Sequence, residues 1–326
     1  MEIEQHNNKR FLFEESEHYK DVYISNNKTK YYINKQLGYG SYANIFNISY
    51  SITNNVSDFE KRNSPRCIKV FKKSTKYTEF AKREVEILSK IKHPTFFVSA
   101  FDAFMHEGHF CIIFNKYDLN LYQYIKKCIL CKFDIILISK QLLKGLVYMN
   151  NKNIIHGDLK PENILVNVKN DSVITCAICD FNLAIETTEY INYKDTNVST
   201  LWYRAPEIYL DMKYSYEIDI WAFGCILYEL ISGKALFRPK CTNNNIQNNK
   251  HLYELHLSFI GKCPFNLLED YGTLNLDNKI TFDTKIFKTG YQTIFSECIK
   301  WNPKKRMIPE GCLKYIRQMI QRRPRL

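Results

Sequence analysis

Apolar and polar residues alternate through the first third of the chain in the way that β-strands require. Residues 31–37 alternate with a period of two and lead into Gly38-Tyr39-Gly40, and residues 44–52 continue as a second strand. This pattern predicts a β-hairpin that carries glycines in its turn. After a polar loop, a short apolar run over 67–71 predicts a third strand.

A helical pattern follows the third strand. Apolar positions recur every three or four residues over 78–91, which predicts a helix with one apolar side formed by Phe80, Val85, Leu88 and Ile91. His93-Pro94 should end this helix, because proline disfavours helical backbone in the residue before it. Two more strands are predicted near 98–104 and 110–115.

The remainder of the chain has mainly helical periodicity, with long apolar helices predicted over 135–150 and 216–232. A strand-rich first third before a helical remainder predicts an α+β fold of two lobes, hinged near residues 114–118, and small molecules often bind at such boundaries. The expected parts are an N-terminal extension (1–30), a lobe with an antiparallel sheet and one key helix (31–117), a larger helical lobe (118–317) and a basic tail (318–326).

Composition narrows the setting of the protein. The chain has 326 residues, eleven scattered cysteines and a formal charge of +12. Its first residues are too polar for a secretory signal, and no stretch approaches the roughly 18 apolar residues of a membrane span. We therefore expect a cytoplasmic or nuclear protein with reduced thiols and no membrane partner. The basic residues cluster between Arg317 and Arg325, which is typical of nucleic-acid contact or of a solvated terminal face.

The strongest chemical signal is the segment Ile154-Ile155-His156-Gly157-Asp158-Leu159-Lys160-Pro161-Glu162-Asn163-Ile164-Leu165. It resembles the catalytic loop of protein kinases, with Gly157 where arginine is usual. The resemblance implies that Asp158 accepts a hydrogen bond from the substrate hydroxyl and that Lys160 steadies the γ-phosphate as it leaves. It also implies that Asn163 binds a magnesium ion. A lysine at position 160 is the pattern of serine/threonine kinases.

Two further segments resemble the metal and phosphate sites of the same family. Cys179-Asp180-Phe181-Asn182 resembles the D-F-G element, whose aspartate, here Asp180, chelates magnesium. Asn182 replaces the glycine, and we expect the turn to survive because asparagine tolerates positive φ. Residues 37–45 resemble the Gly-rich loop, with Ala43 in place of the third glycine. The nucleotide-binding residues expected here are Leu37, Gly38, Gly40 and Ile45.

The predicted strand over 67–71, which carries a lysine, follows the Gly-rich segment at the distance that the kinase resemblance requires. Lys69 in Cys67-Ile68-Lys69-Val70 resembles the lysine that pairs with the α- and β-phosphates of ATP. A buried cation needs compensation, and we expect Glu84 to supply it. Glu86 is the rival partner, but Arg-Glu-x-x-x-Leu is the usual register of the helix and places Leu88 one turn further on.

The resemblance also implies how adenine is bound. Aligning Phe114 with the gatekeeper position makes Asn115, Lys116 and Tyr117 the hinge between the lobes, whose backbone would hydrogen-bond adenine. Leu165 would form the apolar floor of the site.

Other matches concern the architecture of the helical lobe. Thr200-Leu201-Trp202-Tyr203-Arg204-Ala205-Pro206-Glu207 resembles the substrate-side loop that ends in A-P-E. We expect Glu207 to pair with Arg306, Asp219 to support the catalytic loop, and the Thr200 side chain to hydrogen-bond Asp158 and Lys160.

The similarity to eukaryotic protein kinases covers about residues 31–317. Within them, Trp202-Tyr203-Arg204 and the segment after Phe237 are similar to the CMGC group. The Gly-rich loop, the small residue before Asp158 and residues 251–264 resemble the SR-protein kinase, CLK and DYRK branch. The Thr200–Glu207 segment is instead similar to cyclin-dependent kinases, and the basic charge does not suggest an acidic groove for Arg-Ser substrates.

The resulting hypothesis is a monomeric serine/threonine protein kinase that uses ATP and Mg²⁺ on protein substrates, either Arg-Ser-rich or proline-directed. The rival is a catalytically weak pseudokinase that serves as a scaffold, because Ala43, Gly157 and Asn182 depart from three motifs. The residues expected to touch phosphate, metal and hydroxyl are all present, which favours the enzyme.

Gly157 has a consequence for regulation. In many kinases the arginine at this place binds a phosphate on the activation loop, and glycine cannot. The position of the activating phosphothreonine falls on Asp195, and the tyrosine position of MAP and DYRK kinases falls on Asn197. We therefore expect activity that does not wait on phosphorylation of this loop, whether Asp195 is a built-in charge or a solvated residue.

Overall fold

The computed structural model describes residues 23–26, 29–52, 65–186, 199–264 and 290–321. The chain divides into two compact units, one within Met1–Thr78 and Phe101–Lys116 and the other within Glu79–Ala100 and Tyr117–Leu326. Asp195, Asn197 and the arginines after residue 321 lie outside the described residues. In the described part of the chain, no helix is both long enough and apolar enough to cross a membrane.

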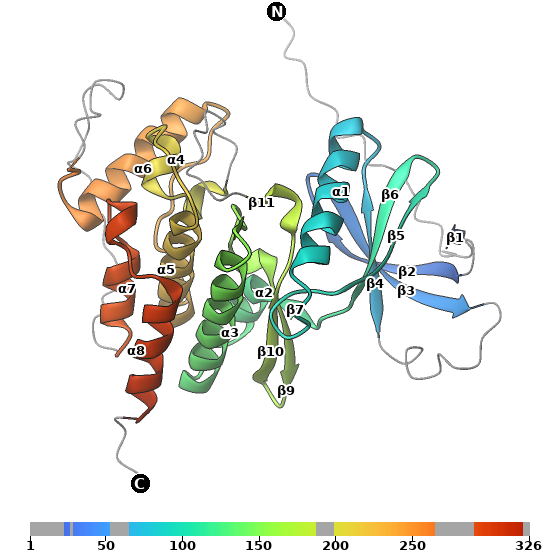
Figure 1. Cartoon of the computed structure of the whole chain (residues 1–326), viewed down its shortest axis with the longest axis horizontal. Helices are drawn as coiled ribbons and strands as arrows, with labels where there is room; N and C mark the ends of the chain where they lie inside the picture. The colour runs from blue at the N-terminus through green and yellow to red at the C-terminus, as the bar shows by residue number, and fades with distance from the viewer. Residues whose placement is uncertain (1–22, 27–28, 53–64, 187–198, 265–289, 322–326) are drawn as a thin grey trace, which may run out of the picture. The chain divides into compact units, whose positions relative to one another are not determined.

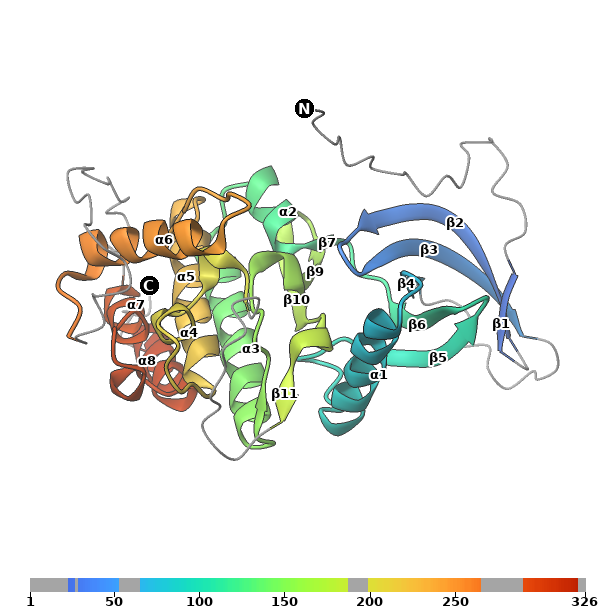
Figure 2. The same cartoon turned by 90° about the horizontal axis from the view of Figure 1, so that it is seen from above.

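The first unit is built on a six-stranded sheet with the order β1-β2-β3-β4-β6-β5 (Figures 1 and 2). The strand pairs β1–β2, β2–β3, β3–β4 and β4–β6 are antiparallel. The strands are β1 Tyr23–Asn26, β2 Thr29–Tyr39, β3 Ala43–Ile52, β4 Arg66–Phe71, β5 Ala100–His106 and β6 His109–Asn115. The predicted α+β class is confirmed, and so is every strand predicted in this region, although β5 begins two residues later than expected. The predicted boundaries of the four parts stay a prediction.

Period-two alternation explains which side chains fill the core of this sheet. Residues two apart on one strand point to the same face. Buried apolar side chains follow that spacing on β2, β3 and β6 and pack with Ile68 of β4 in one cluster, which comprises Tyr31, Ile33, Phe46, Ile48, Ile68, Cys111 and Ile113. The alternation seen in the sequence therefore corresponds to one buried face.

Helices dominate the second unit (Figure 1). They are α2 Leu121–Lys127, α3 Lys132–Asn150, α4 Pro206–Tyr209, α5 Glu217–Ser232, α6 Asn245–Ile260, α7 Gln292–Cys298 and α8 Pro309–Gln321, and most of α1 Thr75–Lys90 also belongs here. Short strands form two small sheets with the orders β10-β9-β7 and β11-β8. Their bounds are β7 Leu119–Asn120, β8 Ile154–Ile155, β9 Ile164–Lys169, β10 Ser172–Ile178 and β11 Ile185–Glu186.

Helix α5 forms the centre of this unit. It is apolar on all sides, and fourteen of its sixteen residues are buried, which is the expected place for such a helix. It contacts α3 and α7, and α3 in turn contacts α8. Two acidic residues in the first turn of α5, Glu217 and Asp219, are buried with it.

The apolar side of α1 agrees with the prediction in part, because Leu88 and Ile91, which lies just after the helix, are buried as predicted. The buried residues of the helix are Ala81, Glu84, Ile87 and Leu88, whereas Val85 and Phe80 are only half-buried. The hydrophobic pattern assigned the inward position to Val85, but the carboxylate of Glu84 occupies it. The pattern of apolar residues alone cannot predict that a charged side chain is buried.

Candidate active site

Helix α5 supports the catalytic-loop segment through hydrogen bonds to Asp219. The backbone N–H groups of His156 and Gly157 donate to the two carboxylate oxygens of Asp219, at 2.7 and 3.0 Å. Burial raises the pKa of Asp219, while His156 and the two backbone hydrogen bonds act in the opposite direction. The predicted supporting role of Asp219 is confirmed.

The backbone at Gly157 is left-handed, with φ of 78°. Glycine enters this region without the steric cost that a Cβ imposes. The residue that departs from the usual arginine is therefore well suited to the local backbone, and it presents no side chain to a phosphate.

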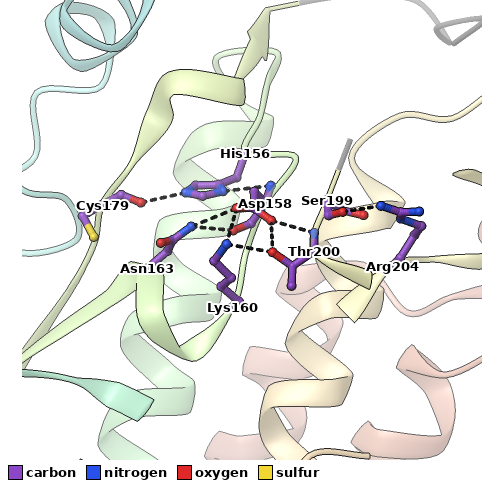
Figure 3. Close-up of polar contacts among 8 residues, drawn as sticks. All are labelled: His156, Asp158, Lys160, Asn163, Cys179, Ser199, Thr200 and Arg204. Carbon is purple, nitrogen blue, oxygen red and sulfur yellow. Dashed lines mark hydrogen bonds and ion pairs between the residues drawn. The ribbon is translucent and has the colours of Figure 1, made fainter. Parts of the chain in front are cut away.

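His156 connects the loop to the end of β10. The Asp158 N–H donates to His156 Nδ1 at 3.2 Å, so the ring proton resides on Nε2, which donates to the Cys179 carbonyl at 3.0 Å (Figure 3). The Cys179 N–H in turn donates to the Asn163 carbonyl at 3.0 Å. These bonds fix the start of the Asp180 segment against the catalytic loop.

Three predicted residues, Lys160, Asn163 and Thr200, meet at the Asp158 carboxylate (Figure 3). Lys160 Nζ donates to Asp158 Oδ2 at 2.6 Å and to Thr200 Oγ1 at 2.7 Å. Thr200 donates to Asp158 Oδ1 from both its backbone nitrogen and its hydroxyl, each at 2.8 Å. Asn163 Nδ2 lies 2.8 Å from the Asp158 carbonyl and 3.3 Å from Oδ2. The predicted contacts of Thr200 are confirmed.

The electrostatics of Lys160 show which charges lie near it. Burial alone would lower the pKa of Lys160, but the carboxylates of Asp158, Asp180 and Glu162 raise it overall. These carboxylates therefore favour the charged form of Lys160, and the Asp180 carboxylate lies within electrostatic reach of it.

The turn at Asp180 differs from the expectation. Asp180 itself is left-handed, with φ of 67° and ψ of 64°, and Asn182 is not among the residues with positive φ. Asn182 is instead buried in a 3₁₀ turn over Phe181–Leu183. Phe181 anchors this turn, 5.0 Å from the His156 ring and 5.8 Å from Phe97. Tolerance of positive φ is therefore not the reason that asparagine is accepted at 182.

Asn163 and Asp180 offer oxygen donors of the kind that magnesium prefers. The Asn163 side chain donates both of the hydrogen bonds described above from Nδ2, and its Oδ1 lies on the opposite side of the amide. Mg²⁺ commonly binds one or two protein oxygens and completes its shell with phosphates and water. The donor chemistry fits such an ion.

The Gly-rich segment belongs to the first unit. The Gly40 N–H donates to the Ala43 carbonyl at 2.9 Å, and a Cβ on Gly40 would lie only 3.0 Å from that oxygen. The strand register places Gly38 opposite Ile45 and Ile45 opposite Lys69. Leu37 and Ile45 remain exposed at this end of the sheet. Three predicted nucleotide contacts therefore lie side by side on β2, β3 and β4.

The two candidate partners of Lys69, Glu84 and Glu86, differ in how deeply they are buried. The Glu84 side chain is buried, with 1% exposure, whereas the Glu86 side chain is 64% exposed and pairs with Lys90 at 2.8 Å. Lys69 itself is buried on β4. A buried carboxylate needs a cation far more than an exposed one does, which favours Glu84.

The predicted adenine contacts fall in both units. Asn115 ends β6, next to the buried Phe114, and its carbonyl accepts from Cys67 Sγ at 3.8 Å. Tyr117 and the half-buried Leu165 belong to the second unit, and burial raises the pKa of Tyr117 to about 12. These assignments stay predictions.

The predicted pair of Glu207 and Arg306 is confirmed. Arg306 Nη1 and Nη2 donate to the two oxygens of Glu207 at 2.6 and 2.7 Å, and both side chains are buried. Arg306 also donates to the carbonyls of Glu217 and Lys300. It thereby connects α4, α5 and the segment before α8.

Two buried contacts of the substrate-side loop were not predicted from the sequence. Arg204, which is buried, donates from Nη2 to the Ser199 carbonyl at 2.8 Å (Figure 3) and from Nη1 to Asn249 Oδ1 at 3.0 Å. Tyr203 donates to the buried Glu229 at 2.6 Å. Arg204 and Tyr203 belong to the Thr200–Glu207 segment, but nothing in the spacing of the sequence indicates which residues they contact.

Comparison with known proteins agrees with this geometry. A family model described as the protein kinase domain matches residues 31–316. The probable serine/threonine-protein kinase clkA of Dictyostelium discoideum is 33% identical over 251 residues, which are 64% of this chain and 26% of that protein. A probable dual specificity protein kinase YAK1 homolog of Encephalitozoon cuniculi is 33% identical over 76% of this chain and 57% of its own length. The serine/threonine-protein kinase prp4 of Schizosaccharomyces pombe is 27% identical over 91% of this chain and 68% of its own length. The first two matches thus span less than two thirds of those proteins.

Proposed function

Because the chain belongs to the protein kinase family, we propose that it transfers the γ-phosphate of ATP to serine or threonine hydroxyls of protein substrates. The observation that carries this proposal is the cluster in which Asp158 is held by Lys160, Asn163 and Thr200. Asp158 would accept the hydrogen bond of the substrate hydroxyl, and Lys160 would neutralise charge on the transferred group. The Asp158 carboxylate accepts four hydrogen bonds, one from Lys160, one from Asn163 and two from Thr200, which fill its roughly four lone-pair sites. The substrate hydroxyl would therefore replace the longest of them, from Asn163 at 3.3 Å.

ATP and Mg²⁺ are the cofactors that the remaining residues fit. Backbone N–H groups around Gly38 and Gly40 would approach the phosphates, and Lys69, with Glu84 as its expected partner, would neutralise them. Asn163 and Asp180 would hold the metal, which when bound neutralises charge on the phosphate oxygens. Asn115, Tyr117 and Leu165 would contact adenine.

The backbone beside Asp158 favours proline after the phosphorylated residue. Thr200 contacts Asp158, so the carbonyl of Ser199 lies next to the place where the substrate chain must run. Arg204 already occupies that carbonyl. A substrate N–H aimed at it would lose its partner, at a cost of about 1–3 kcal/mol, whereas proline has no N–H to leave unpaired.

Two carboxylates favour a basic residue elsewhere in the substrate. Glu162 is exposed in the catalytic loop, and Glu229 is buried nearby. Burial raises the pKa of Glu229, the Tyr203 hydroxyl opposes this, and the charge of Glu162 adds to it. Two carboxylates that repel each other are stabilised when an arginine or lysine approaches.

The specificity is tested with an arrayed library of serine and threonine peptides and labelled ATP. We expect the strongest signals from peptides that combine a following proline with a basic residue. Acidic-directed or tyrosine-only phosphorylation would contradict the proposed substrate class. Specific ATP binding without transfer to any peptide would favour the scaffold instead.

A further inference from the structure

Lys90, the last residue of helix α1, forms an ion pair with Glu186 of strand β11. The two residues are 96 positions apart in the sequence, and both belong to the second unit. Lys90 also pairs with Glu86, one turn earlier on α1, at 2.8 Å. One ammonium group therefore connects its own helix to the segment that follows Asp180.

Strand β11 is joined to the catalytic loop through β8. The two strands pair antiparallel, with Glu186 opposite Ile154. Ile154 is buried and lies two residues before His156, whose backbone N–H donates to Asp219 at 2.7 Å. The carboxylate at the other end of the ion pair is therefore anchored, through the backbone, to the catalytic loop.

Helix α1 also carries Glu84, the expected partner of Lys69. Glu84 and Lys90 are six residues apart, which separates them by about 9 Å along the helix axis and by about 120° around it. Glu84 is buried, whereas the side chain of Lys90 is 35% exposed. A contact at Lys90 opposes rotation of the helix about its axis, and it thereby fixes the direction in which Glu84 points.

We propose that Lys90 and Glu186 are positioning residues that hold α1, and with it Glu84, in the orientation that phosphate transfer requires. This inference rests on the proposed function, because it concerns the expected pair of Glu84 and Lys69. Gly157 offers no side chain to a phosphate on the loop, and the ion pair connects α1 to the segment after β10 without one. Both residues act through the helix and not on the reacting atoms.

The expected effect on activity is moderate, because the ion pair is near the surface. The side chain of Glu186 is 48% exposed, and ion pairs in such places are weak and are screened by salt. A weak contact still decides between two orientations of a helix when their free energies are similar. Loss of the pair should therefore lower the fraction of molecules with α1 correctly placed, and hence kcat, while the melting temperature stays the same.

The test measures kcat for a serine peptide at saturating ATP and Mg²⁺. Glu186→Lys places a second cation beside Lys90 and should lower kcat about five- to tenfold. Adding Lys90→Glu to this variant restores an ion pair of reversed direction, and kcat should return to within about twofold of the unmodified chain. Such a recovery is not expected if either residue merely stabilises the fold.

Glu86→Lys is the matched control. It makes the same change of charge beside the same ammonium group, but Glu86 lies on α1 itself and cannot connect the helix to β11. The kcat of this variant should stay within about twofold of the unmodified chain.

Salt provides a second readout. At low salt, Glu186→Gln should lower kcat about two- to fivefold. Raising the KCl concentration to about 1 M shortens the Debye length to about 3 Å and screens the pair in the unmodified chain. The ratio of kcat between the unmodified chain and Glu186→Gln should therefore approach one. If Glu186→Lys does not fold, this ratio tests the same role with a smaller substitution.

The possible failures are distinguishable. An active unmodified chain, together with a folded Glu186→Lys variant of unchanged kcat, would overturn the role of the pair and leave the proposed function standing. An equal fall of kcat in Glu86→Lys, no recovery in the doubly substituted chain, or a ratio for Glu186→Gln that does not change with salt would also overturn it. No phosphate transfer by the folded unmodified chain would overturn the proposed function and this inference together.

Discussion

Lys160 donates hydrogen bonds to Asp158 and Thr200 at 2.6 and 2.7 Å, and Thr200 closes the triangle by donating to Asp158. The Thr200 hydroxyl therefore positions both charged groups. We predict that Thr200→Val lowers kcat about 10- to 100-fold, because hydrogen bonds to charged groups are lost. Thr200→Ser, which keeps the hydroxyl, should retain most of the activity. Equal activity of the valine and serine variants would show that the triangle is not needed.

Burial predicts that Glu84 and Glu86 differ in importance. Glu84→Gln should lower kcat/KM about 10- to 100-fold, as is typical when a group that orients a functional ligand is removed. Glu86→Gln, on the same helix, should have little effect, because the Glu86 side chain is exposed and its ion pair with Lys90 lies at the surface. Steady-state kinetics at varied ATP concentration measures both variants. A larger loss in Glu86→Gln would reverse the assignment.

The Glu207–Arg306 pair predicts a large effect on stability. Glu207→Gln leaves the Arg306 charge buried without its carboxylate and should lower the free energy of unfolding by about 3–5 kcal/mol. Glu297→Gln is the control, since the pair of Glu297 and Lys300 is about one-third exposed and should contribute only about 0–1 kcal/mol. Urea denaturation followed by fluorescence measures both. Similar shifts in the two variants would contradict the structural role.

The raised pKa of Glu229 predicts a pH dependence of substrate choice. Burial favours the neutral carboxyl, so on acidification Glu229 becomes protonated at a higher pH than an ordinary glutamate. The kcat/KM ratio of an arginine peptide to its alanine counterpart should therefore fall as the pH is lowered below neutrality. In Glu229→Gln the ratio should be low and should change less with pH. A ratio in the unmodified chain that is independent of pH would exclude Glu229 as the group that recognises the basic residue.

Gly157 predicts activity without phosphorylation of the substrate-side loop. It has no side chain to bind a phosphate, and its N–H is used by Asp219. Treatment with phosphatase, with loss of phosphate verified by mass spectrometry, should leave most of the activity. A large loss that is restored by rephosphorylation within residues 187–200 would show the opposite.

Much of this site could be predicted because its chemistry is local in sequence. Asp158, Lys160 and Asn163 lie within one loop, and the resemblance of that loop to the catalytic loop of protein kinases predicted that they would act together. Glu207 is distant in sequence from Arg306, and Asp219 is distant from the catalytic loop. Both contacts were predicted only from the family resemblance. Asn249 lies 45 residues from Arg204, on a polar helical turn, and no periodicity links the two. Two other expectations were wrong for different reasons. Helical periodicity placed Val85 on the buried side of α1, where Glu84 is more deeply buried. The resemblance to the D-F-G element suggested a positive φ at Asn182, but the left-handed residue is Asp180.

Phosphate transfer from ATP to a peptide hydroxyl should be compared between the unmodified chain and Asp158→Asn, with the modified residue identified by mass spectrometry. The unmodified chain is expected to phosphorylate serine or threonine in the presence of ATP and Mg²⁺. The variant should be about 10²–10⁴-fold slower at an unchanged melting temperature, because it lacks the carboxylate that accepts the substrate proton. Equal rates in the two proteins, or no transfer by a folded unmodified chain, would contradict the assignment of Asp158 and of the kinase activity.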